Sequence, residues 1–227
     1  MPLIGVLIVP QVIVALMGYR SFELSSGSMK PTLERGDVVL AKPLGRMLIG
    51  TLTEPPERGA VLVLTHPKSG LTYASRVIGL PGETIELRAG QVHIDGVPVP
   101  QRQIEDHTEA YIRIDRRLPE CVNSPALNGV CRKHTFVEAL PGGREIRVLD
   151  TGETSADDTR PQIAPPRHVY LISDHRDNAV DSRISRSIGG LGPVPFDSLT
   201  HRVELYWLPR DLGALWASLD RVLEPVP

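Results

Sequence analysis

The chain has 227 residues and a mass of 24.9 kDa, enough for one large or two small domains, and 41% hydrophobic residues exclude wholesale disorder. Its formal charge of −2 offers no bulk attraction to polyanions, so no nucleic-acid partner is expected. Twenty-one prolines and 20 glycines, with 4% aromatic residues, favour many short segments joined by turns over a helix bundle.

The first segment, residues 2–18, carries no charge and is followed by Tyr19 and Arg20. We expect an uncleaved membrane anchor over residues 1–19, with the lipid bilayer as its partner, although a full span needs about 20 apolar residues and Pro10 and Gln11 interrupt this one. A cleaved secretory signal and a buried core segment are the alternatives, and no small-residue cleavage site follows the run.

From Asp37 onward, apolar residues alternate with polar ones in short bursts, which is typical of strands. The pattern predicts a mainly β body, with a hairpin over Thr84–Pro98 that turns at Ala89 and Gly90. The predicted strands lie within residues 37–43, 60–67, 84–90, 91–100, 145–150, 168–173 and 202–209.

Residues 101–167 differ from this body because they are richer in charge, proline, asparagine and glycine, and we interpret them as an inserted region. They contain Cys121 and Cys131, the only cysteines of the chain, for which a disulfide is the natural pairing in an exported domain. Zinc would need four ligands, and only His134 is near, so no metal is expected.

Near the C-terminus, apolar residues recur at helical spacing between Leu212 and Leu223. The pattern predicts a short amphipathic helix within residues 209–227. Its apolar face would pack on the β body or lie in the membrane surface.

The segment Ser25–Leu33 places three serines around Gly27 and ends its turn with Pro31. Such a turn lets a hydroxyl and backbone N–H groups converge, as a nucleophile and an oxyanion site require. Taken alone, the same pattern is also typical of a linker between an anchor and a domain.

Four sequence blocks in order give this turn a context, and together they resemble the type I signal peptidases of bacteria. The blocks are SGSMKPTL, RGDVVLAKP, RVIGLPGETIEL followed by HIDG, and SDHRDNAVDSR, and a later stretch, GGLGPVPFDSLTHRVELYW, also fits the end of that family. The resemblance covers residues 20–208. It implies a mostly β catalytic domain on the outer face of a bacterial cytoplasmic membrane, with signal peptides of exported preproteins as substrates and no cofactor.

Carried over by position, the resemblance makes Ser28 the nucleophile, with Ser26 and the Ser28 N–H forming the oxyanion hole. The family's general base is a buried lysine, and its position here is Ser75. A neighbouring serine that supports this lysine is replaced by Ala179. A serine hydroxyl cannot accept a proton near neutral pH as an amine can, and alanine has no hydroxyl to support one. The base and its supporting hydroxyl are therefore both missing.

Three other residues could in principle supply a base. His175 stands in the last block and has a suitable ordinary pKa, although a solvated or structurally bonded histidine is the expected role. Lys30 and Lys42 do not match the position of the base.

Ion pairs and hydrogen bonds that hold the last block against the third are expected from Arg76, Asp174, Asp177, Asp181 and Arg183. Arg76 cannot act as a base because guanidinium stays protonated.

The sequence therefore predicts a signal peptidase I-like serine endopeptidase that cleaves preproteins very slowly or not at all. A homologue that binds a peptide or a partner without cleavage is the alternative. An extended substrate would dock beside the strand that contains Val38 and Val39. The absence of a DNA-binding helix pair disfavours a self-cleaving repressor.

Overall fold

The structure is a computed structural model that describes residues 18–44, 52–65, 72–113, 117–208 and 225–227. Within these residues the regular structure is mainly strand, together with two single-turn 3₁₀ helices, η1 (Arg186–Ile188) and η2 (Phe196–Ser198). The strands are β1 (Arg20–Glu23), β2 (Val38–Pro43), β3 (Val61–Thr65), β4 (Thr72–Gly79), β5 (Thr84–Arg88), β6 (Gln91–Ile94), β7 (Val97–Pro98), β8 (Gln101–Ala110), β9 (Val130–Ala139), β10 (Glu145–Asp150), β11 (Gln162–Ile163), β12 (His168–Ile172), β13 (Val194–Pro195) and β14 (His201–Leu208).

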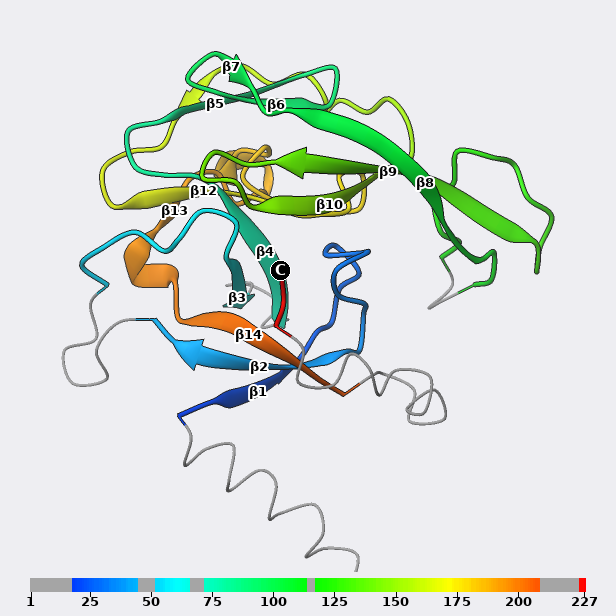
Figure 1. Ribbon diagram of the computed structural model, residues 1–227, viewed down its shortest axis with the longest axis horizontal. Helices are drawn as coiled ribbons and strands as arrows, with labels where there is room; N and C mark the ends of the chain where they lie inside the picture. The colour runs from blue at the N-terminus through cyan, green and yellow to red at the C-terminus, as the bar shows by residue number, and fades with distance from the viewer. Residues whose placement is uncertain (1–17, 45–51, 66–71, 114–116, 209–224) are drawn as a thin grey trace, which may run out of the picture.

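These strands form three sheets (Figure 1). The largest has the order β1-β2-β14-β3-β4-β12-β13, the second the order β10-β9-β8, and the third the order β11-β5-β6-β7. All pairs between the named strands are antiparallel. In Figure 1 the second sheet continues into a long β8–β9 ribbon that reaches beyond the body of the molecule.

The alternating segments predicted as strands form strands in the structure, which confirms the mainly β prediction. The predicted hairpin is present, because β5 pairs with β6 in a register that places Arg88 opposite Gln91. Ala89 and Gly90 form its turn with φ angles of 46° and 76°. Two successive positive φ angles are typical of the tight turns whose twist matches that of the flanking strands.

Among the longer strands, sequence patterns missed β1, β4, β8 and β9. In β8 most side chains are exposed or half-buried, so it lacks the apolar alternation on which a strand prediction depends. In β9 the inward positions do alternate, but two of them are polar, Lys133 and Thr135. Their burial depends on neighbours far away in sequence. The assignment of residues 101–167 as an insertion and the predicted domain boundaries stay predictions.

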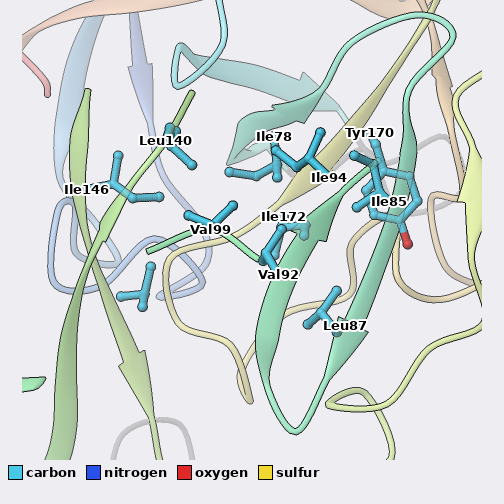
Figure 2. Close-up of a cluster of buried hydrophobic side chains, with 11 residues drawn as sticks. Ile78, Ile85, Leu87, Val92, Ile94, Val99, Leu140, Ile146, Tyr170 and Ile172 are labelled. Atoms are coloured by element: carbon cyan, nitrogen blue, oxygen red, sulfur yellow. The ribbon is translucent and has the colours of Figure 1, made fainter. Parts of the chain in front are cut away.

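The main hydrophobic core lies between the sheets, and Figure 2 shows its side chains converging from β4, β5, β6, β10 and β12. Gly79 marks the closest approach, because a Cβ atom there would lie 2.6 Å from Ile85 and 2.8 Å from Tyr170. A larger residue at this position would therefore push two core side chains apart.

A second cluster of buried side chains underlies the segment that contains Ser28. Leu24, Met29 and Leu33 are at most 1% exposed and pack with Val39 and Ala74 of the largest sheet. Because apolar residues flank Ser28 on both sides and are buried, the hydrophobic effect holds its turn against the sheet.

The expected docking position beside Val38 and Val39 is wrong. In the register of the sheet, Val39 lies between Phe22 of β1 and Tyr206 of β14. Both edges of β2 are therefore paired at this point, and no edge is available for a substrate strand.

The predicted anchor and the predicted C-terminal helix fall almost wholly on residues 1–17 and 209–224, outside the described residues. Within the described ranges, no helix has the length and apolarity that crossing a membrane requires. The three C-terminal residues are described and run beside β14, where Pro225 bridges to Leu205 and the Val226 N–H donates to the Glu204 carbonyl at 3.0 Å.

Candidate active site

The turn that contains Ser28 lies on the edge of β4, just before the point where β12 begins to pair. The Ser25 N–H donates to the Thr72 carbonyl at 2.9 Å, and the Ser28 hydroxyl donates to the Ala74 carbonyl at 3.3 Å. Ala74 precedes Ser75, so the structure brings the predicted nucleophile beside the strand position predicted for the base.

The two predicted oxyanion donors, Ser26 and Ser28, lie side by side and are bonded to each other. The Ser28 N–H donates to the Ser26 hydroxyl oxygen at 3.1 Å, and Ser28 is only 5% exposed. Here the N–H is satisfied by the neighbouring hydroxyl. An incoming carbonyl oxygen would replace this contact and take both donors, the amide and the hydroxyl.

Ser75 is fully buried and bonded to another serine. Its hydroxyl lies 3.0 Å from the hydroxyl of Ser173, which is 2% exposed. The position predicted for the base thus holds two neutral hydroxyls that satisfy each other. Sequence reasoning missed Ser173, although it is the first residue of the last block, SDHRDNAVDSR.

Of the two ion pairs that the predicted residues form at this last block, one joins it to the third block, as predicted, and the other lies within the last block. Arg76 donates to Asp174 from Nε at 2.8 Å and from Nη2 at 2.6 Å, and both side chains are at most 1% exposed. Asp181 accepts from Arg183 Nε at 2.9 Å and from the Ser173 N–H at 3.0 Å. These buried carboxylates therefore position the Ser173 segment on both sides.

Two further predicted residues are less closely tied to Ser28. Asp177 accepts from the Thr151 N–H at 2.6 Å, which ties the block to the end of β10 rather than to β4. Ala179 is half-buried, and its neighbour Asn178 has an amide nitrogen 3.7 Å from the position that a Cβ on Gly27 would take. That Ala179 lines the pocket of Ser75 stays a prediction.

His175 is buried directly behind the Ser28 turn. Its backbone N–H donates to the Ser28 carbonyl at 2.8 Å, and its ring Nε2 lies 3.0 Å from Lys133 Nζ. Its other ring nitrogen, Nδ1, is buried and has no hydrogen-bond partner among the residues that the structure describes. Burial, and then the nearby Lys133 charge, lower the pKa of His175 to about 3, so the ring is neutral near pH 7.

Lys133 is the functional candidate that sequence reasoning missed. It lies on β9, is 2% exposed, and its ammonium nitrogen contacts the Glu120 carbonyl at 2.7 Å and the Glu109 carboxylate at 3.2 Å. Burial lowers the pKa of Lys133 below its ordinary value even though Glu109 opposes this shift. Only its position at an inward-facing site of β9 could have signalled it, and that strand was not predicted.

The two lysines weighed from the sequence lie in different surroundings. Lys30 pairs with Glu109 at 2.5 Å and Glu34 at 3.5 Å; burial opposes ionisation, but these carboxylates outweigh it and raise the pKa of Lys30. Lys42 is exposed and lies over the ring of Tyr19, 4.8 Å from its centre. Neither is suited to remove a proton from Ser28.

The predicted disulfide is present. Cys121 and Cys131 are bridged with their Cα atoms 5.3 Å apart. The bridge ties the loop that contains Glu120, whose carbonyl contacts Lys133, to the first residues of β9. Among the described residues, no group of three or more His, Cys, Asp or Glu side chains could hold a metal ion.

Known proteins resemble this chain along most of its length. It is 26% identical over 202 residues to "Signal peptidase I" of Pseudomonas aeruginosa, a match that covers 82% of this chain and 64% of that protein. It is 35% identical over 224 residues to "Signal peptidase I" of Buchnera aphidicola subsp. Acyrthosiphon pisum, covering 85% of this chain and 69% of that protein. The chain thus spans somewhat less than two thirds of the Pseudomonas protein.

A solved structure of a signal peptidase I from Enterococcus faecalis V583 matches 64% of this chain and 94% of its own, with 20% identity and a TM-score of 0.33. The sequence model of the family described as "Signal peptidase, peptidase S26" matches residues 1–208, almost the whole chain. By this match, and by its identity to the Buchnera protein, the chain belongs to the signal peptidase family, peptidase S26.

Proposed function

We propose that this chain is a serine endopeptidase of the signal peptidase I type, which removes signal peptides from exported preproteins. The observation that carries the proposal is the placement of Ser28. Its turn is held by buried neighbours, its hydroxyl lies against Ala74, and its N–H lies beside the Ser26 hydroxyl. Membership of the peptidase S26 family supports the same reaction class.

In this proposal, the Ser28 oxygen attacks the carbonyl carbon of the scissile peptide bond. The negative charge that develops on the carbonyl oxygen is received by the Ser28 N–H and the Ser26 hydroxyl. The acyl-enzyme that results is hydrolysed by water, and the signal peptide and the mature protein leave separately.

The proposed location follows from the substrate. Residues 1–19 would anchor the chain in the bacterial cytoplasmic membrane, with the β domain on its outer face, where exported preproteins emerge. The disulfide between Cys121 and Cys131 supports an exported domain, because such bonds persist in oxidising compartments.

One observation favours a second candidate function, peptide binding without cleavage. The hydrogen bond between Ser75 and Ser173 joins two neutral hydroxyls at the position that the family resemblance assigns to a lysine. A chain that has lost its base could keep the fold and the oxyanion site and still hold a signal peptide.

Incubation of the purified full chain with a preprotein tests the two functions, with mass spectrometry of the new N-terminus. We expect slow cleavage that Ser28→Ala abolishes and that Ser187→Ala, at an exposed serine of η1, leaves unchanged. Binding of the preprotein with no Ser28-dependent product would overturn the peptidase and favour the second function.

A further inference from the structure

We propose that His175 and Lys133 together accept the Ser28 proton in place of the absent lysine. This inference rests on the proposed role of Ser28 as nucleophile. It concerns a different strand from the one on which a base was expected, because Lys133 lies on β9 and Ser75 lies on β4.

The first reason is position. The His175 backbone is bonded to the Ser28 carbonyl at 2.8 Å, so the two residues are fixed relative to each other. The bond from the Ser28 hydroxyl to the Ala74 carbonyl is long, at 3.3 Å, and therefore weak. Rotation of the Ser28 side chain about its Cα–Cβ bond therefore loses little hydrogen-bond energy when the hydroxyl turns to another acceptor.

The second reason is the unused nitrogen of the imidazole. Histidine has two ring nitrogens, and in the neutral ring one donates while the other accepts. Nε2 is 3.0 Å from Lys133 Nζ, whereas the buried Nδ1 finds no partner among the described residues. An unsatisfied buried polar atom costs free energy. In the proposed arrangement, Nδ1 gains its missing hydrogen bond when the Ser28 hydroxyl turns toward it.

The third reason is the state of Lys133. A neutral amine at Nζ can accept the Nε2 proton, and burial favours that neutral form. The charged and titratable groups around the pair come from several elements: Glu109 and His107 on β8, Lys30 and Glu34 beside the Ser28 turn, and Glu120 in the disulfide loop. Glu109 favours the ammonium form of Lys133, but the same carboxylate also pairs with Lys30, whose positive charge offsets part of this effect.

The proposed relay moves two protons and leaves the imidazole neutral. As the Ser28 oxygen forms a bond to the substrate carbonyl carbon, its proton passes to Nδ1 of His175. The proton on Nε2 passes at the same time to Nζ of Lys133, which becomes an ammonium. When the peptide bond breaks, Nδ1 gives its proton to the nitrogen of the leaving amine, and Nζ of Lys133 returns a proton to Nε2, so that the imidazole and the amine regain their starting states.

Two substrates and four variants test this relay. A small activated ester, the p-nitrophenyl ester of N-acetylalanine, reports acylation of Ser28 as a burst of p-nitrophenolate, and a preprotein reports cleavage. The full-length variants are Lys133→Met, Lys133→Arg, His175→Asn and the exposed control Lys42→Met, each compared between pH 6 and pH 9 with Ser28→Ala as the baseline.

We expect Lys133→Met, Lys133→Arg and His175→Asn to lower both rates by roughly 10²- to 10⁴-fold, the usual contribution of a general base. The wild-type rate should rise with pH as one proton leaves Lys133, and Lys42→Met should behave like the wild type. Lys133→Arg is the decisive variant, because it keeps the positive charge and the pairing with Glu109 but cannot become neutral. Retention of the wild-type rate and pH profile by the Lys133→Arg variant would overturn the relay.

The two substrates separate the relay from the proposed function. A Lys133-dependent burst without preprotein cleavage overturns the signal-peptide substrate and supports the relay. Ser28-dependent cleavage that Lys133→Arg leaves intact supports the function and overturns the relay. A folded wild type that gives neither product overturns both.

A measurement without turnover provides an independent check. The chain contains only four lysines, so selective ¹³C labelling at Cε gives four signals that single Lys→Arg variants assign. Lys133 should titrate below the ordinary value of a lysine amine, and His175→Asn should move its titration. A Lys133 signal that titrates at or above the ordinary value of a lysine, 10.5, would overturn the relay, because the amine would then be protonated throughout the assay.

Discussion

Ser75 and Lys133 lie on two different sheets, and each meets a partner from the same short segment after β12. Ser75 is bonded to Ser173, and two residues later His175 is bonded to Lys133. The first pair consists of two neutral hydroxyls, whereas the second contains two nitrogen bases. In the proposed relay, the neutral pair on β4 is compensated by basic groups on a strand of another sheet, β9, which meets the same segment.

The largest expected effect comes from placing an amine at position 75 in a chain whose Lys133 has been replaced. In a Lys133→Met background, Ser75→Lys alone should restore little cleavage, because Ser173 occupies the space beside residue 75 and Ala179 offers no hydroxyl. Adding Ser173→Gly and Ala179→Ser should raise preprotein cleavage by roughly 10²- to 10⁴-fold.

The matched control for this restoration is Ser75→Arg with the same two companion changes, which has a charge but no neutral amine. Equal gains from lysine and arginine would contradict the idea that position 75 acts through proton transfer. So would a full gain from Ser75→Lys alone.

The ion pair between Arg76 and Asp174 supports both pairs, because Asp174 lies between Ser173 and His175 in the chain. Arg76→Leu should lower the free energy of unfolding by about 3–5 kcal/mol, since it leaves a carboxylate buried without its partner. Arg102→Leu, which removes an exposed pair with Glu145, should cost about 0–1 kcal/mol. Urea denaturation of both variants measures the difference, and similar values would show that the Asp174 charge is not buried.

The disulfide supports the pair of Lys133 and His175, because it ties down the loop whose Glu120 carbonyl contacts Lys133. Replacing both cysteines by serine should lower the free energy of unfolding by about 3 kcal/mol, as expected for closure of a short loop. In the labelled protein, the ¹³C signal of Lys133 should shift while that of Lys42 does not. A shift of neither signal would mean that the bridge does not position Lys133.

The smallest expected effect is a change in the pH dependence of stability. The pKa of His175 is lowered to about 3 in the folded chain, so between that value and its ordinary 6.5 the unfolded chain binds more protons. Stability therefore rises with pH in this window, and lowering the pH from 6.5 to 5 costs at most about 2 kcal/mol through this one group.

His175→Asn should flatten this part of the pH profile relative to the wild type. Urea denaturation at pH 5 and pH 6.5 checks it, with His168→Asn as the control at a half-buried histidine whose Nδ1 lies 2.9 Å from the nearby Pro166 carbonyl. Equal slopes for the wild type and His175→Asn would show that the ring accepts a proton in the folded state.

The sequence alone was sufficient where a signal is local. Alternating apolar residues predicted β2, β3, β5, β6, β10, β12 and β14, and the pair Ala89–Gly90 predicted the turn between β5 and β6. Short ordered blocks were enough for the family and for the serine turn, because the proposed nucleophile and its proposed oxyanion donors lie within a few residues. The spacing of Cys121 and Cys131 predicted their bridge for the same reason.

Tertiary structure decided what depends on contacts between distant residues. The pairing of Ser75 with Ser173 joins residues 98 positions apart, and that of Lys133 with His175 joins residues 42 positions apart. Lys133 lies on a strand whose buried face is partly polar, so no hydrophobic period marks its side chain as buried. Burial, and with it the lowered pKa of an amine, is a property of the packed sheets, because only folding removes the water around the side chain.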